Sequence, residues 1–289
     1  MKTRPNVYST PSPWDLVADG YARTTMRVLG QYSEEAIKMA NLARGTSVLD
    51  VACGPGTLSL LAAKKVSEVK AIDFSRRMLS IFKSRLKSNS LPHVKVFQGD
   101  GQALPFKNES FDAAFSMFGL MFFPNRPKGF AELYRMLKPG GRAVVSSWAP
   151  ISRSPSMKAM FGALRAMNPD LPEPQKAMKS LENPKVFKEE MSGAGFKDVR
   201  IIAVRKPFPT TSVKTYWTMM VDGSAPIVML RKKLGEKTWK EREKLALDYL
   251  AKHWPSFSGR LTSDAWLGVG TKLGTKTIYT EVSKVSKIL

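Results

Sequence analysis

Residues 48–58, VLDVACGPGTL, contain the pattern that decides the fold. A short apolar run surrounds Asp50, a turn containing Gly54 and Gly56 follows, and an apolar pattern then resumes. This order predicts a buried strand, a tight turn and a helix, because glycine lets the backbone turn sharply and approach a ligand closely. Such turns most often bind nucleotide-like ligands. No Gly-Lys-Ser/Thr follows, which excludes a phosphate-binding P-loop.

Further strand patterns follow at regular spacing, with helical patterns between them. The apolar or β-branched runs are residues 46–52, 68–74, 93–99, 111–117 and 141–148, and the helical patterns between them include 76–88 and 127–138. Strands and helices that alternate in this way predict a parallel sheet with helices on both faces. The fold class is therefore α/β and Rossmann-like.

The remaining segments are predicted to elaborate this core. We expect N-terminal helices over the ligand, a nucleotide-binding core, two insertions and a last strand. Residues 14–43 contain two helical patterns, the second predicted to begin at Ser33, and 262–272 are predicted as an edge strand. The predicted segments are 1–44 (N-terminal helices), 45–149 (core), 150–183 (lid insertion), 184–208 (core helix and strand), 209–261 (helical insertion) and 262–289 (last strand and basic tail).

Composition limits the function classes. The single cysteine, Cys53, cannot form an intramolecular disulfide, and two histidines without a Cys/His cluster predict no metal site. No apolar stretch is long enough for a spanning helix and the first residues do not resemble a signal peptide, so we expect a cytoplasmic protein, with peripheral membrane contact left open. The net charge of +22 keeps a nucleic-acid partner open as well.

Two acidic residues follow the glycine turn, each at the end of a predicted strand. Asp73 ends the second predicted strand, and Asp100 ends the third within GDGQALPF, residues 99–106. The turn and Asp73 fit NAD enzymes and S-adenosylmethionine enzymes equally, whereas a carboxylate after the third strand is placed to accept from an adenine amine. Together with FDAAFSM (111–117) and LKPGGRAVVS (137–146), these motifs strongly resemble the class I S-adenosylmethionine-dependent methyltransferases, in particular the branch with the ubiquinone and menaquinone methyltransferases.

The resemblance implies a seven-stranded, mostly parallel sheet with helical insertions that form a lid, and an S-adenosyl-L-methionine site that yields S-adenosyl-L-homocysteine. It places the methionine end at the glycine turn, the ribose at Asp73, the adenine near Asp100, and a tyrosine of the first helix over the cofactor. The implied cofactor-binding residues are Tyr21, Asp50, Cys53, Gly54, Gly56, Asp73, Phe74, Met78, Asp100, Gly101, Gln102 and Met117.

The acceptor is less defined by the sequence. Aromatic and methionine-rich stretches predict an apolar pocket, with Phe118, Phe122, Trp148, Met160 and Trp217 as candidate walls. We therefore expect a small hydrophobic or aromatic acceptor, such as a quinone precursor, a lipid head group or a natural product. No residue is assigned as catalytic. A tRNA or rRNA methyltransferase and a non-catalytic cofactor-binding scaffold are the alternatives, and the oligomeric state stays open.

Overall fold

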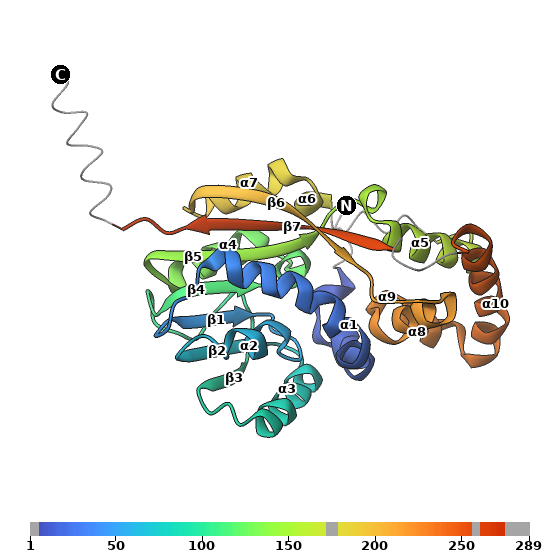
Figure 1. The fold of residues 1–289 in the computed structure, drawn as a ribbon, viewed down its shortest axis with the longest axis horizontal. Helices are drawn as coiled ribbons and strands as arrows, with labels where there is room; N and C mark the ends of the chain where they lie inside the picture. Colours follow the sequence, from blue (N-terminus) through green and yellow to red (C-terminus); the bar gives the residue numbers. More distant parts are fainter. Residues whose placement is uncertain (1–5, 172–178, 256–260, 275–289) are drawn as a thin grey trace, which may run out of the picture.

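The computed structural model describes residues 6–171, 179–255 and 261–274, and these form a seven-stranded sheet with helices around it (Figure 1). The strand order is β3-β2-β1-β4-β5-β7-β6. The pairings among β1 to β5 are parallel, and β7 is antiparallel to both β5 and β6. The strands are β1 (Ser47–Val51), β2 (Glu68–Asp73), β3 (Val94–Gln98), β4 (Phe111–Ser116), β5 (Leu137–Trp148), β6 (Lys197–Pro207) and β7 (Thr262–Thr271). The α/β, Rossmann-like fold class is confirmed.

Helices pack in two groups around the sheet. Helix α1 contacts α2 and α3, whereas α4 contacts α7. These helices are α1 (Pro11–Ala40), α2 (Thr57–Ala62), α3 (Arg76–Asn89), α4 (Arg126–Met136) and α7 (Pro184–Gly193), with the short α6 (Lys179–Glu182) packed on α7. Single 3-10 turns are η1 (Val7–Ser9), η2 (Leu120–Phe122) and η3 (Ile151–Arg153).

The N-terminal region forms one long helix, so the prediction of a second helix starting at Ser33 is wrong. Ser33 is fully buried inside α1, and its hydroxyl donates to the carbonyl of Leu29 at 3.3 Å. This bond to the preceding turn satisfies the side chain within a continuous helix, so that it does not act as a cap.

The last strand is interior and not an edge. β7 lies between β5 and β6, and residues 263–270 are all buried. Continuous burial reflects cover on both faces of the sheet. The register pairs Trp148 of β5 with Ala265, and Pro207 of β6 with Thr262. β7 therefore begins at the end of the sheet where β5 finishes.

Four helices stand beyond the carboxyl ends of the parallel strands, on the right of Figure 1. They are α5 (Pro155–Met167), α8 (Val213–Gly223), α9 (Ala225–Leu234) and α10 (Glu236–His253), and we call them the helical cap. Their buried side chains form an apolar cluster separate from the core around the sheet. The chain thus surrounds the ends of its strands with a second, helical layer.

The cap is joined to α1 by close backbone packing. A Cβ atom at Gly20 of α1 would lie 2.0 Å from the carbonyl oxygen of Asp222 in α8. Gly20 and Gly223 therefore let the two helices approach closely. Parts of the predicted insertions and the predicted basic tail (172–178, 256–260 and 275–289) lie outside the described residues. Among the described residues, no helix is both long and apolar enough to cross a membrane.

Candidate functional site

A cavity of about 290 Å³ lies at the carboxyl ends of β1 to β4. Ligands of open parallel sheets bind at this position, where the strand order reverses beside β1. The predicted cofactor residues that line it are Tyr21, Gly54, Asp73, Phe74, Met78, Asp100, Gly101, Gln102 and Met117. The structure therefore brings residues from five separate sequence segments to one cavity.

Asp73 joins the glycine turn to the second strand. Its carboxylate accepts from the amides of Gly54 and Ser75, both at 2.8 Å. Burial raises the pKa of Asp73 to about 6, against the lowering effect of these amide hydrogen bonds. Each carboxylate oxygen keeps a second lone pair, so Asp73 can accept ligand hydroxyls while it holds the turn.

The turn itself is built from left-handed backbone. Ala52, Gly54 and Gly56 have φ angles of 57°, 54° and 87°. A Cβ at Gly56 would lie 2.3 Å from the ring of Phe82, so only glycine fits there. A Cβ at Gly54 would meet no atom within 4 Å, and this residue faces the cavity.

The other three predicted cofactor residues, Asp50, Cys53 and Gly56, do not line this cavity. Asp50 lies beneath the turn at 1% exposure and accepts from the hydroxyl of Ser59 at 2.6 Å. Burial raises the pKa of Asp50 to about 7 and that of the Cys53 thiol well above its usual value. These residues lie beneath or within the turn, and their contact with a ligand stays a prediction.

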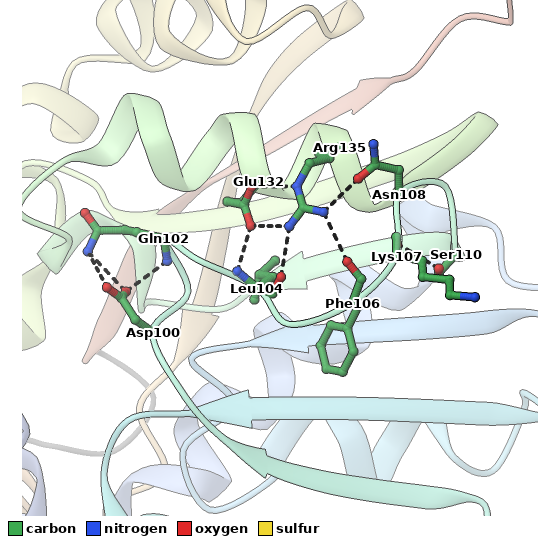
Figure 2. Close-up of polar contacts among 9 residues, drawn as sticks. All are labelled: Asp100, Gln102, Leu104, Phe106, Lys107, Asn108, Ser110, Glu132 and Arg135. Carbon is green, nitrogen blue, oxygen red and sulfur yellow. Dashed lines mark hydrogen bonds and ion pairs between the residues drawn. The ribbon is translucent and has the colours of Figure 1, made fainter.

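The loop after β3 is held by two charged residues of α4 (Figure 2). Arg135 donates to the carbonyls of Leu104 at 2.9 Å and Phe106 at 3.1 Å, and Glu132 accepts from the Leu104 amide at 2.7 Å. Arg135 and Glu132 also pair with each other at 2.6 Å. Arg135 also donates to the side-chain oxygen of Asn108 at 2.7 Å. Four loop groups are thus bound by one ion pair, which holds the segment that follows Asp100.

Asp100 has its own local partner. Its carboxylate accepts from the backbone amide of Gln102 at 2.9 Å and from the Gln102 side-chain amide at 3.1 Å, and the Gln102 side-chain oxygen accepts from the Asn125 amide (Figure 2 shows the Asp100–Gln102 pair). Asp100 is exposed in the cavity. It is therefore held in place and open to a ligand.

Helix α1 is attached to the same site. Asp15 accepts from the hydroxyl of Ser75 at 2.6 Å and from the amide of Arg77 at 3.0 Å, at the start of α3. This contact places Tyr21, two turns further along α1, at the cavity. Burial and the nearby Asp73 carboxylate raise the pKa of Tyr21, so its hydroxyl stays protonated near neutral pH.

A second cavity of about 600 Å³ lies between α1, the end of the sheet and the helical cap. Four of the predicted acceptor-pocket residues line it: Phe118, Phe122, Trp148 and Met160. Trp217 does not. It is 3% exposed inside the cap, and its ring stacks on that of Trp239 with 6.3 Å between the ring centroids. Its indole N–H donates to the carboxylate of Glu243 at 2.8 Å. Its helical face is buried against α10 and not against the cavity.

The two cavities share five aromatic residues: Tyr8, Trp14, Tyr21, Phe118 and Phe122. The ring centroids of Trp14 and Phe122 are 5.0 Å apart, and those of Tyr8 and Phe122 are 5.7 Å apart. We call this set the aromatic junction.

Several lining residues were absent from the sequence-based site. Tyr8 and Trp14 in VYSTPSPWDL were missed, although two aromatic residues in an otherwise polar stretch were a usable signal. Ala52 was missed too. It is a small residue directly after β1, and its left-handed φ shows only in the structure.

The larger cavity contains few groups that titrate. Within the described part of the chain its lining has no Asp, Glu or His, and its charged members are Arg165 and Lys233. Burial also raises the pKa of Tyr8. The same described residues contain no group of three or more His, Cys, Asp or Glu that could hold a metal ion.

Comparisons with known proteins agree with this geometry. Residues 48–141 match the family model described as "Methyltransferase domain". A demethylmenaquinone methyltransferase of Listeria welshimeri is 34% identical over 137 residues, which cover 46% of this chain and 57% of that protein. The chain thus spans a little over half the length of this curated relative.

Solved structures share the fold at lower identity. The YcgJ protein of Bacillus subtilis superposes with a TM-score of 0.55 at 18% identity, over 84% of this chain and 98% of that one. The [4+2]-cyclase SpnF superposes with a TM-score of 0.53 at 19% identity, over 85% and 82%.

The fold and the strand-end cavity agree with the family match, so residues 48–141 are similar to class I methyltransferase domains. Within that class the chain is similar to the ubiquinone and menaquinone methyltransferase branch, as its motifs indicate. The expected resemblance is confirmed.

Proposed function

We propose that this protein is an S-adenosylmethionine-dependent methyltransferase whose acceptor is a small hydrophobic or aromatic molecule. The observation that carries the proposal is the pair of adjoining cavities. One is lined by the motif residues of the methyltransferase domain, the other is mostly apolar, and the aromatic junction belongs to both. A donor and an acceptor bound in the two cavities would meet at the junction.

The residues of the smaller cavity suit S-adenosyl-L-methionine. Gly54 leaves open space beside the turn, Asp73 has acceptor capacity for ribose hydroxyls, and Asp100 is exposed where it can accept from an adenine amine. Phe74 and Met78 supply apolar surface for the adenine ring. When bound, the cofactor supplies an electrophilic methyl group on a sulfonium.

The chain's own contribution is positioning and exclusion of water. Asp73 and Asp100 orient a ligand from the β2 and β3 ends, while the aromatic junction surrounds the point where the cavities meet. Holding two reactants in line supplies a large part of the acceleration of a displacement reaction.

The junction offers hydrogen-bond donors and no evident base. Burial keeps the hydroxyls of Tyr8 and Tyr21 protonated near neutral pH, so each can donate to an acceptor oxygen but is poorly suited to remove a proton. This favours an acceptor that is already nucleophilic or that loses its proton to solvent. We assign no catalytic residue.

Two alternatives are kept. The net charge of +22 is the reason to test a tRNA or rRNA acceptor. A cofactor-binding protein without methyl transfer is the second, since a protein described as a [4+2]-cyclase shares this fold. A cytoplasmic location is part of the main proposal.

The test is methyl transfer from methyl-labelled S-adenosylmethionine in a cell extract, with Asp73→Asn as the site control. Label in an organic-extractable product, reduced in the variant, is the expected result. Label in RNA, with retention that falls steeply as salt rises, would favour the RNA alternative. Tight binding of S-adenosylhomocysteine without transfer would favour the scaffold, and absence of binding would overturn all three.

A further inference from the structure

Two buried serines in the lining of the larger cavity bond to each other. Ser156 lies in the first turn of α5 and Ser263 at the start of β7, and both line the cavity. Their hydroxyl oxygens are 2.5 Å apart, and the two residues are 2% and 3% exposed. Met160 and Leu164, four and eight residues after Ser156, line the cavity from the same face of α5. The hydroxyl pair therefore lies in a wall that is otherwise apolar along this helix face.

The hydrogen-bond count of this pair leaves one hydroxyl hydrogen without an acceptor. Each serine hydroxyl has one hydrogen to donate and two lone pairs that accept. The bond between Ser156 and Ser263 uses one of the two hydrogens, and within residues 6–171, 179–255 and 261–274 neither hydroxyl has another partner. By contrast, the hydroxyls of Thr24 and Thr25, which also line the cavity, already donate to backbone carbonyls at 2.9 and 3.2 Å. A buried donor without a partner is unfavourable, so a ligand oxygen that accepted the second serine hydrogen would be favoured.

The backbone at both serines is held by buried tyrosines. The hydroxyl of Tyr216 in α8 donates to the Ser156 carbonyl, and the hydroxyl of Tyr32 in α1 donates to the Ser263 carbonyl at 2.7 Å. Both tyrosines are fully buried. The two serine hydroxyls are therefore presented from a fixed backbone, as a site that orients a ligand requires.

Tyr32 also connects the serine pair to the aromatic junction. Its ring centroid lies 5.4 Å from that of Phe118, which belongs to the junction, and 5.9 Å from that of Trp148. Its hydroxyl is the donor to the Ser263 carbonyl. The serine pair thus lies one side chain away from the junction, at the end of the cavity that the sheet forms.

We propose that the larger cavity binds an apolar molecule through a carbonyl oxygen, which accepts the second hydrogen of the Ser156–Ser263 pair. A carbonyl oxygen fits because it accepts hydrogen bonds and has no hydrogen of its own that needs a partner. It is also uncharged, so its transfer into the cavity costs less than that of an anion. The inference rests on the proposed function insofar as this molecule is the methyl acceptor. It then names the acceptor's class, an apolar carbonyl compound, and places its oxygen at the serine pair.

The test compares two ligands of nearly the same shape: 4-acetylbiphenyl, a ketone, and 4-isopropenylbiphenyl, in which a CH₂ group replaces the oxygen. Their binding to the full chain is measured by equilibrium dialysis within their aqueous solubility. The double variant Ser156→Ala/Ser263→Ala removes both hydroxyls together, so neither is left without its partner. The matched control is Ser33→Ala/Ser147→Ala, which removes two buried hydroxyls of residues that line neither cavity.

The two ligands differ in hydration, so the quantity compared is the ratio of their dissociation constants in each protein. We expect the double variant to weaken the ketone about fivefold relative to the hydrocarbon, as for the loss of one neutral hydrogen bond, and the control to keep the wild-type ratio. An unchanged ratio in the double variant, an equal change in the control, or no binding of either ligand by wild type would overturn the inference.

A second readout uses wild type alone and does not depend on the folding of a variant. The infrared difference spectrum of bound ketone, labelled at its carbonyl carbon, is compared with that of the ketone in hexane. A hydrogen bond to the oxygen lowers the carbonyl stretching frequency, so we expect the bound value to lie below the hexane value. Equal frequencies would overturn the inference.

Binding of S-adenosylhomocysteine is measured in the same samples. If it binds and the ketone shows neither effect, the inference fails and the proposed function stands. If it does not bind, the proposed function fails independently of the result for the larger cavity.

Discussion

The amide of Gly54 donates a hydrogen bond of 2.8 Å to the carboxylate of Asp73, so the turn after β1 is attached to the end of β2. One side chain therefore holds the glycine turn and lines the smaller cavity. A ligand that bound Asp73 would therefore contact the side chain that also holds the turn.

Asp73→Asn is expected to weaken binding of S-adenosylhomocysteine by about 1–3 kcal/mol, because an amide cannot accept from both backbone amides and still accept from ribose hydroxyls. Isothermal titration calorimetry measures the change. Asp112→Asn is the matched control, since Asp112 accepts from the Ser47 amide at the amino ends of β4 and β1. Wild-type affinity in the Asp73 variant would refute this assignment.

Asp50→Asn tests the buried carboxyl beneath the turn. Its pKa is raised to about 7, from about 3.9 in an unfolded chain, so the folded protein binds the proton more tightly. Protonation of the Asp50 carboxyl therefore stabilises the folded state. This stabilisation is complete below about pH 4 and is lost as the pH rises through about 7. The variant has no titratable group at position 50. We expect the free energy of unfolding of wild type, relative to the variant, to fall by about 2 kcal/mol between pH 5 and pH 7.5. Urea unfolding at both pH values measures it, and a constant difference would contradict it.

Arg135→Met tests the support of the loop after β3. Arg135 makes three hydrogen bonds to that loop, to the Leu104 and Phe106 carbonyls and to the Asn108 side-chain oxygen. Their removal is expected to lower affinity for S-adenosylhomocysteine about fivefold, or about 1 kcal/mol, because the segment that follows Asp100 loses its support. Arg126→Met is the control on the same helix, since Arg126 pairs with Glu190 of α7. We expect both variants to lower the melting temperature but only Arg135→Met to change affinity. Equal affinities in the two variants would show that the loop is held by other contacts.

Gly20→Ala tests the joint between α1 and the helical cap. The new Cβ would lie 2.0 Å from the Asp222 carbonyl oxygen, so the helices must separate, and we expect a loss of about 1–3 kcal/mol in unfolding free energy. Gly30→Ala in the same helix has its nearest neighbour at 3.9 Å and is expected to stabilise the protein by up to about 1 kcal/mol. Chemical denaturation of the pair measures the contrast. Stabilisation by both substitutions would mean that the cap is not closely joined at Gly20.

The parallel core was predictable because its information is local. Buried strands such as β1 and β4 are short apolar runs, and the turns after the parallel strands contain the glycines and acids of the predicted cofactor site. Asp73 and Asp100 were placed at one cavity because the carboxyl ends of parallel strands meet at one edge.

The features that were missed depend on contacts across the chain. Arg135 looks like an ordinary helix cation until the loop of residues 99–110 folds back onto it. Trp217 shows a buried helical face, but the sequence does not say which neighbour buries it. The interior position of β7 follows from its pairing with both β5 and β6, which no local pattern contains.

The pairing of Pro207 with Thr262 has an evolutionary consequence. The Phe208 amide also donates to the Leu261 carbonyl at 2.8 Å, so the intervening chain leaves and rejoins the sheet at one place. A segment with neighbouring ends is an exchangeable module. Under the proposed function, relatives that differ between these two points would keep the same donor chemistry while they acquire new acceptor preferences, which makes 209–261 the natural segment to transplant in a chimera.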